Sequence, residues 1–244
     1  MAGGEATAFH TRILRLTLAV QESRAFWEAV DPAVVGAARV ERAFNERWFG
    51  NKSLARVKLL LSNFAARFES YPEALETLRR WRPGELGTRA LVCHWHLQLS
   101  DPLYRMFTGD WLPTRLDDGR RQFDRDAVAR WLGDVGNTAI APSTRFQYAT
   151  KLIRAADEAG LVSPSNDGPR TALTPRVPDE ALGYLVRVLQ LVPHQGTWQD
   201  NAYFRSVGLT PELIDARLRR LPDVTYRRMG ELVELTASPL GAMA

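Results

Sequence analysis

The sequence predicts a mainly α-helical protein with two helical subdomains and helix-turn-helix elements, the C-terminal subdomain winged-helix-like with a small β-hairpin. Three observations lead to this prediction. Apolar residues recur at steps of three and four along most of the first hundred residues, as on the buried face of an amphipathic helix. A stretch with Pro113, Gly119 and several charges is typical of a linker. After it, a short helix, a turn, a longer helix and a hairpin signal follow in the order of a winged helix.

Six helices are expected in the N-terminal subdomain, which we place at residues 1–115. Their ends carry recognisable signals. Asp31-Pro32, for example, offers an N-cap followed by proline at the first helical position. The helix near 85–99 is apolar almost all round, which predicts a central place in this half. The expected ranges are 13–30, 32–47, 52–68, 74–81, 85–99 and 102–107.

The boundary of the C-terminal subdomain, residues 116–244, falls within the linker expected at 111–122. The subdomain starts with a short Asp-capped helix, a turn and a longer helix closed by Gly160. Two β-like stretches, LVS and TAL, then flank an Asp-Gly pair that signals a hairpin. The last residues alternate weakly over 224–236. The expected helices are 124–132, 143–159, 179–191 and 210–221.

Composition is that of an ordinary globular protein, with 45% hydrophobic and 25% charged residues in 244, which excludes global disorder. Cys93 is the only cysteine, so no internal disulfide forms and a reducing compartment is expected. No run approaches the roughly 20 apolar residues of a membrane span, and the N-terminus lacks the basic region of a signal peptide. We therefore expect a soluble, cytoplasmic protein with no membrane partner.

Positive charge is concentrated around the start of one N-terminal helix. The whole chain has a net charge of +4, whereas the stretch 39–68 alone has seven basic and two acidic residues, a net +5. Lys52 and Arg56 lie one helical step apart, opposite the apolar stripe. A phosphate-binding patch explains the whole cluster and a solvated helix face explains part of it, so both interpretations stay open. The basic residues are Arg39, Arg42, Arg47, Lys52, Arg56, Lys58 and Arg67.

The longer C-terminal helix, 143–159, carries charges that oppose its own dipole. Arg145 lies in its first turn, and Asp157 and Glu158 lie in its last. A helix favours the reverse arrangement by about 0.3–1 kcal/mol per side chain. The pattern makes sense if the N-terminal half meets phosphate, where free N–H groups and an arginine act together. The alternative is a solvated face that tolerates a small penalty.

One face of this helix is expected to pack and the rest of its circumference to meet DNA, because the second helix of such a motif enters the major groove. The expected packing residues are Phe146, Ala149, Ile153 and Ala156. The expected DNA-facing residues are Arg145, Gln147, Tyr148, Lys151 and Arg154. Arg170 and Arg176, beside the hairpin, would reach the adjacent backbone.

Catalytic signatures are missing from the sequence. It has no phosphate-binding loop, nucleophile elbow, HExxH zinc motif or dinucleotide-binding glycine pattern. The run Cys93-His94-Trp95-His96 could suggest a metal or nucleophile site, but neighbours on a helix point in different directions. We expect this run to be packed core with one hydrogen-bonded histidine. We expect no enzyme activity, no cofactor, no metal and no small-molecule substrate.

Several segments resemble one known family. FHTRILRLTLAVQESRAFWEAVD, NERWFGNKSLARVKLLLSNFAARF, STRFQYATKLIRAADEAGLV and GLTPELIDARLRRLPDVTYRRMGELVEL are similar, in order, to segments of the BrxA family of BREX bacteriophage-exclusion systems. The likeness spans most of the chain and rests on aromatic and basic patterns rather than on a catalytic signature.

The resemblance implies a non-catalytic, double-stranded-DNA-binding protein of antiviral defence and phage resistance. It would act beside a methyltransferase and other BREX proteins, with two basic helices on the DNA. Carried over by position, the DNA-binding residues are Lys52, Ser53 and Arg56 in the first, and Thr144, Arg145, Tyr148 and Lys151 in the second.

Two other functions stay open from the sequence. A helical adaptor for other defence proteins would use its arginines only for solubility, and would show no salt-sensitive binding to any nucleic acid. An RNA-binding helical protein would expose aromatic side chains for stacking on unpaired bases, and Tyr148 is the only candidate for that.

Overall fold

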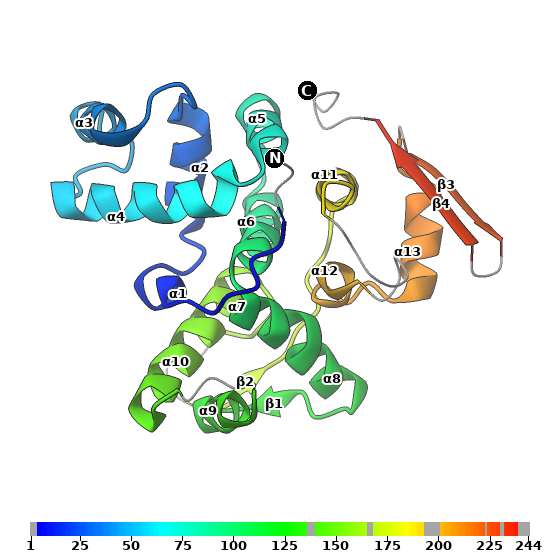
Figure 1. Cartoon of the computed structure of the whole chain (residues 1–244). Coiled ribbons are helices and arrows are strands. Elements are labelled where there is room, and N and C mark those ends of the chain that lie inside the picture. Colours follow the sequence, from blue (N-terminus) through cyan, green and yellow to red (C-terminus); the bar gives the residue numbers. More distant parts are fainter. Residues whose placement is uncertain are drawn as a thin grey trace.

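A computed structural model of the chain describes residues 4–135, 140–164, 168–192, 201–222, 224–229 and 232–238. These residues are mainly helical, with a small antiparallel hairpin near the C-terminus (Figure 1). The mainly α fold class is therefore confirmed. No helix in the described ranges is long and apolar enough to cross a membrane.

The N-terminal half contains the expected series of helices, with shifted ends and one additional break. Helix α4 continues without interruption into the π-helical turn η1. The elements are α1 (Arg12–Arg15), α2 (Val20–Ala29), α3 (Gly36–Asn45), α4 (Leu54–Phe64), η1 (Ala65–Glu69), α5 (Pro72–Trp81) and α6 (Leu86–Ser100).

The first expected helix is two helices, because distant residues bind the backbone between them. Arg67 donates to the carbonyls of Leu18 and Thr17, both at 2.9 Å. Glu158 accepts from the Thr17 hydroxyl at 2.9 Å and from the Ala19 N–H at 3.1 Å. Ala19 takes a left-handed conformation, with φ of 49°. These long-range bonds replace the local helical ones, which no local sequence pattern indicates.

Helix α3 begins later than the Asp31-Pro32 signal predicts. The Asp31 carboxylate accepts a hydrogen bond from the N–H of Ala33 at 3.0 Å and closes a turn there. The helix starts only at Gly36, whose φ of +62° favours glycine. An Asp-Pro pair suits a turn as well as a helix start.

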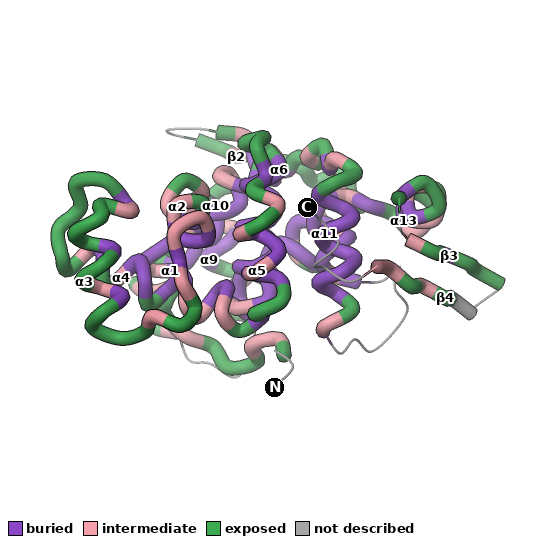
Figure 2. The backbone as a smooth tube through the Cα atoms, turned by 90° about the horizontal axis from the view of Figure 1, so that it is seen from above, coloured by how far each residue is buried: buried purple, intermediate pink, exposed green. Residues whose placement is uncertain are grey.

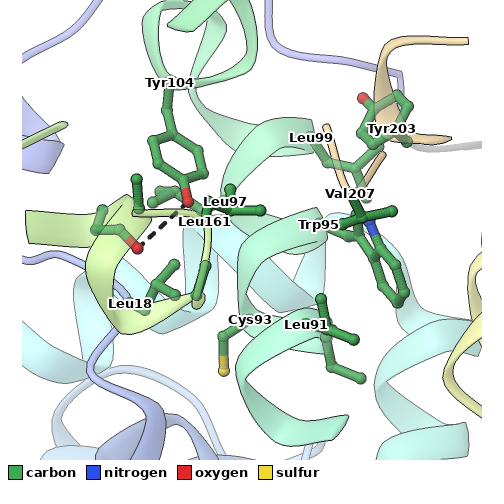
Figure 3. Close-up of a cluster of buried hydrophobic side chains, with 14 of the residues drawn as sticks. Leu18, Leu91, Cys93, Trp95, Leu97, Leu99, Tyr104, Leu161, Tyr203 and Val207 are labelled. Carbon is green, nitrogen blue, oxygen red and sulfur yellow. Dashed lines mark hydrogen bonds between the residues drawn. The ribbon is translucent and has the colours of Figure 1, made fainter. Parts of the chain in front are cut away.

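Helix α6 lies at the centre of the structure, as its sequence predicts. Every residue from Thr88 to Leu99 is buried, and Figure 2 shows the helix among buried segments. Trp95 packs beside Tyr203 and Val207, while Tyr104 lies on another side of the helix and donates to the Ala155 carbonyl at 3.4 Å (Figure 3). Helices from both halves of the chain therefore pack on α6.

The segment expected to be a linker is helical over half its length. Helix α7 (Pro102–Met106), the π-helical turn η2 (Phe107–Trp111) and α8 (Leu112–Asp117) form one continuous run. The Trp111 ring packs 5.1 Å from the ring of Phe123. Pro113 lies in the first turn of α8, directly after the π-helical turn, where the α-helical hydrogen-bond pattern is already interrupted. The expectation of a linker over 111–117 is therefore wrong.

Buried apolar side chains from Ile13 to Tyr226 belong to one connected core. The division into subdomains at residues 115 and 116 stays a prediction.

The described part of the C-terminal half has helices of 4 to 17 residues and two small two-stranded sheets. The predicted helices near 124–132, 143–159, 179–191 and 210–221 are all present. The elements are β1 (Gln122–Phe123), α9 (Arg125–Asp134), α10 (Pro142–Glu158), β2 (Arg170–Thr171), α11 (Asp179–Leu189), α12 (Ala202–Arg205), α13 (Pro211–Leu218), β3 (Val224–Met229) and β4 (Leu232–Ala237).

The weakly alternating end of the chain is an antiparallel hairpin of β3 and β4. Its register runs from Val224 opposite Ala237 to Met229 opposite Leu232. Tyr226 is buried and donates from its hydroxyl to the carboxylate of Asp215 in α13. The hairpin lies at the edge of the molecule, beside α13 (Figure 1).

Candidate nucleic-acid interface

The candidate interface is built on α9 and α10, where the sequence predicts a helix-turn-helix. Asp124 caps α9 by accepting a hydrogen bond from the Ala127 N–H at 2.7 Å. The two helices pack closely and cross: Figure 1 shows α9 end-on and α10 from the side. Val128 and Leu132 of α9 and Leu152 of α10 are buried in the core. Residues 136–139 of the connecting turn lie outside the described residues.

Short strands flank this helix pair on both sides in the sequence. β1 precedes α9 and pairs antiparallel with β2, which follows α10, so that Gln122 lies opposite Thr171. Val162 bridges to Ala172, and the Leu173 N–H donates to the Leu161 carbonyl at 2.8 Å. The two β-like stretches of the sequence are thus paired. Residues 165–167 of the Asp-Gly turn lie outside the described residues.

One face of α10 is open to solvent and carries no acidic side chain before Asp157. Ser143, Gln147 and Thr150 are exposed on it, and Lys151 is half-buried at its border. Arg154 is also exposed, although its Nε donates to Glu158 at 3.1 Å. Because 143, 147, 150 and 154 are three or four residues apart, these side chains line one stripe. We call it the α10 stripe.

Phe146 lies at the edge of the α10 stripe, which we extend to include it, rather than in the core, so its assignment to the packing face is wrong. Its side chain is 42% exposed. The guanidinium of Arg125, at the start of α9, lies 5.4 Å from the centre of the ring. This cation–π contact holds the exposed ring against α9.

Tyr148 is buried rather than exposed, so its expected position on the open circumference is also wrong. Only 7% of the residue is accessible, and its hydroxyl donates to the His10 carbonyl at 3.3 Å. Burial raises the pKa of Tyr148. The segment around His10 packs on this side of α10. A contact between residues so far apart in the sequence cannot be predicted from the apolar periodicity of the helix itself.

Arg145 braces the helix-turn-helix instead of extending into solvent. Its Nε donates to the Ile140 carbonyl at 2.8 Å, at the end of the turn. Its guanidinium lies against Gly133 of α9, where an added Cβ would come within 2.7 Å of Nη1. Thr144 beside it is half-buried. Arg145 therefore joins α9, the turn and α10, which gives it a positioning role.

The two acids at the end of α10 have partners within the protein. Asp157 lies 3.9 Å from Nη1 of Arg170, which also donates to the Ser163 carbonyl at 3.1 Å. Glu158 holds the segment at Thr17 described above. Asp157 and Glu158 lie at the unfavourable end of the α10 dipole because they bind other parts of the protein. Arg170 is bound to Asp157 and to the backbone, so it does not extend freely into solvent.

A groove of about 770 Å³ runs beside the α10 stripe, between the start of α9 and the segment that leads into β2. Its lining is of mixed charge, with three aspartates, Asp124, Asp126 and Asp157, and three arginines, Arg125, Arg154 and Arg170. The groove is not a strongly positive surface, and the acid-free part of the site is the N-terminal half of α10.

The second predicted site, at the start of α4, is only partly available. Ser53 caps the helix by accepting from the Arg56 N–H at 3.3 Å. Lys52 is exposed and lies 3.9 Å from Glu22. Arg56 is half-buried and Lys58 exposed, and neither has an acidic partner within ion-pair distance in the described ranges. A hollow of about 460 Å³ lies between this helix start and the end of α3.

The net charge of +5 over 39–68 overstates the positive surface. Arg39 is buried, pairs with Glu69 and donates to the Val34 carbonyl. Arg67 is buried and bonded to backbone carbonyls. Arg42 pairs with Glu46 at 3.0 Å. Counting charges along the sequence cannot separate arginines that hold loops from arginines that face solvent.

The Cys93–His96 run lies in the core, as expected, although both of its histidines are hydrogen-bonded rather than one. His94 lies 2.9 Å from the hydroxyls of Tyr104 and Ser206. His96 lies 2.6 Å from the Tyr184 hydroxyl. Burial lowers the pKa of each imidazole to about 3 and raises that of the Cys93 thiol to about 12. Within the described part of the chain, no cluster of three or more metal-binding side chains occurs.

Sequence reasoning missed two members of the α10 stripe, Ser143 and Thr150, and misplaced Phe146. A signal was available: Tyr148, Leu152, Ala155 and Ala159 recur at steps of three and four and form an alternative apolar stripe. If this stripe is taken as buried, Phe146 is placed on the outside.

Comparison of the chain with models of known families, with characterised proteins and with solved structures finds no match.

Proposed function

We propose that this protein binds double-stranded DNA without catalysis, using residues 122–173 as a winged helix-turn-helix whose second helix, α10, enters the major groove. In line with the resemblance of its sequence to the BrxA family, we place it in a BREX phage-defence system in the cytoplasm, beside other BREX proteins.

The observation that carries the proposal is the open, acid-free face at the start of α10. A surface helix commonly leaves a polar face in solvent, so it is the lack of acidic side chains on this face that favours a polyanionic partner. Here Ser143, Gln147 and Thr150 are exposed, and no described residue accepts or donates a hydrogen bond to the side chain of Ser143 or Gln147. Such side chains can reach base edges, while the free N–H groups at a helix N-terminus favour phosphate.

The order of elements supports the same proposal. β1, α9, α10 and the paired segments after α10 follow one another as in a winged helix. Arg145 ties α10 to the turn and to α9, which would hold the inserted helix at a constant angle. Arg125 and Lys151 flank the stripe and are suited to phosphate.

The test is duplex binding by a variant with Lys151→Gln and Arg154→Gln. Glutamine avoids placing a new carboxylate beside Glu158, which a glutamate at 154 would do. We expect the wild-type affinity to fall steeply between about 50 and about 200 mM salt, and the variant to bind at least about tenfold more weakly at the lower salt. Fluorescence anisotropy with a labelled duplex, and separately with a single strand and an RNA, measures this.

The matched control changes Arg219→Gln and Arg220→Gln, two exposed arginines that follow α13, away from α10 (Figure 1). It removes the same charge and should leave duplex affinity nearly unchanged. Equal weakening by both variants would reduce the effect to net charge. Wild-type protein that binds no nucleic acid at low salt would favour the adaptor function instead.

A further inference from the structure

The α10 stripe contains an unusual combination of groups for a basic protein. Its first half has two apolar surfaces and a free amide, but no free arginine. Phe146 is 42% exposed, and Thr150 lies one turn later on the same face. Gln147 follows Phe146 in the sequence and is also exposed. These three side chains determine which base pairs α10 could recognise.

The orientation of Thr150 strengthens this description. Its hydroxyl donates to the Phe146 carbonyl at 2.8 Å, within the helix. The hydroxyl is therefore engaged by the helix backbone, and the methyl group is the part of the side chain left without a partner. Together with the Phe146 ring, it makes an apolar step of one helical turn.

The arginines nearest to this step have partners within the protein. Arg145 is bonded to the Ile140 carbonyl and packed on Gly133. Arg125 stacks on the Phe146 ring at the start of α9, and Arg154 pairs with Glu158 two turns further on. Arginine is the commonest reader of guanine, through its O6 and N7 atoms. In the described part of the chain, no unpaired arginine therefore lies on the first half of α10, and the nearest lysine, Lys151, is half-buried at the border of the stripe.

We propose that α10 prefers A·T base pairs in the major groove, with Phe146 and Thr150 contacting thymine methyl groups and Gln147 binding adenine. An apolar side chain is complementary to the thymine C5-methyl, and a glutamine amide pairs with the N6 and N7 of adenine. This inference rests on the proposed DNA-binding function and adds to it a base preference that phosphate contacts cannot supply.

The experiment compares three duplexes of about 20 base pairs: one with an A·T core, one with a G·C core, and the A·T duplex with uracil in place of thymine. Uracil differs from thymine only by the missing methyl group. We expect wild-type protein to bind the A·T duplex at least about fivefold more tightly than the G·C duplex, and to lose most of that difference with uracil.

Variants assign the preference to the stripe. Phe146→Ala with Thr150→Ser should bind the thymine and uracil duplexes equally, and Gln147→Ala should lower the A·T preference while keeping sensitivity to the methyl group. Thr150→Ser retains the hydroxyl that bonds to the Phe146 carbonyl. The matched control, Lys151→Gln, should weaken binding to all three duplexes by the same factor.

The failure of this inference and the failure of the proposed function give different results. Salt-sensitive binding with equal affinity for all three duplexes would overturn the base preference and leave a phosphate-only DNA-binding protein. Binding to none of the three would overturn both.

Discussion

Individual buried side chains in this protein form hydrogen bonds to backbone groups that lie outside helices and strands. Arg67 is the clearest case, since its guanidinium donates to the carbonyls of Thr17 and Leu18 between α1 and α2. We expect Arg67→Met to remove the bond to the Thr17 carbonyl and to leave the Leu18 carbonyl with only the Ser23 hydroxyl as donor, which should lower the free energy of unfolding by about 2–3 kcal/mol. Urea denaturation measures this. Arg79→Met, at a partly exposed site on α5, is the control and should cost less than about 1 kcal/mol.

The two core histidines make stability depend on pH. Burial lowers the pKa of His94 and His96 to about 3 in the folded protein, whereas an unfolded histidine titrates near 6.5. The unfolded chain therefore binds protons first as the pH falls. We expect each histidine to lower the free energy of unfolding by about 1.4 kcal/mol per pH unit below pH 6.5, with no effect above it.

Denaturation of the wild type and of a His94→Gln, His96→Gln variant over this pH range separates the histidines from other groups. Asp101 acts in the opposite direction, because burial raises its pKa and the folded state then binds a proton more tightly. The difference in slope between the two proteins should thus report the histidines. Parallel curves would contradict this assignment.

At the scale of single elements, the acidic side chains at the C-terminal end of α10 bind other parts of the protein, whereas one face of its N-terminal half is exposed to solvent. Glu158 joins the end of α10 to the α1–α2 connection through Thr17 and Ala19. We expect Glu158→Gln to lower the free energy of unfolding by about 1–3 kcal/mol and, because it also releases Arg154 from its ion pair, to raise duplex affinity slightly. Chemical denaturation and anisotropy on the same sample measure both. A loss of affinity in the folded variant would show that the acid also shapes the DNA-binding face.

The same helix shows what local sequence can and cannot predict. Its existence and its end at Gly160 follow from periodicity and from glycine at the left-handed position after the helix, with φ of +75°. Its buried face does not, because the segment around His10 packs on Tyr148 from 138 positions away. The break before Ala19 has the same kind of cause. Local patterns therefore predict helices well and predict which side chains remain free poorly.

At the scale of the whole molecule, the proposed DNA-binding surface is centred on α10, and the start of α4 is a second region of free positive charge. Figure 1 shows α4 and α10 reaching toward the same side of the molecule, with α1 between them. Lys52, Arg56 and Lys58 are weak alone, since Lys52 is close to Glu22 and Arg56 is half-buried. A contact that engages only after α10 is seated would nevertheless add to affinity, because it needs no separate encounter.

This arrangement predicts that the two regions respond differently to duplex length. A duplex of about 12 base pairs is about 40 Å long and one of about 30 is about 100 Å, at 3.4 Å per pair. We expect Lys52→Gln with Arg56→Gln to weaken binding only to the longer duplex, and to reduce its salt slope by about 1–2. Lys151→Gln with Arg154→Gln should weaken binding to both. If the α4 variant binds the longer duplex with wild-type affinity and salt slope, the DNA-binding surface is confined to α9 and α10, and the cations of α4 are a solvated helix face.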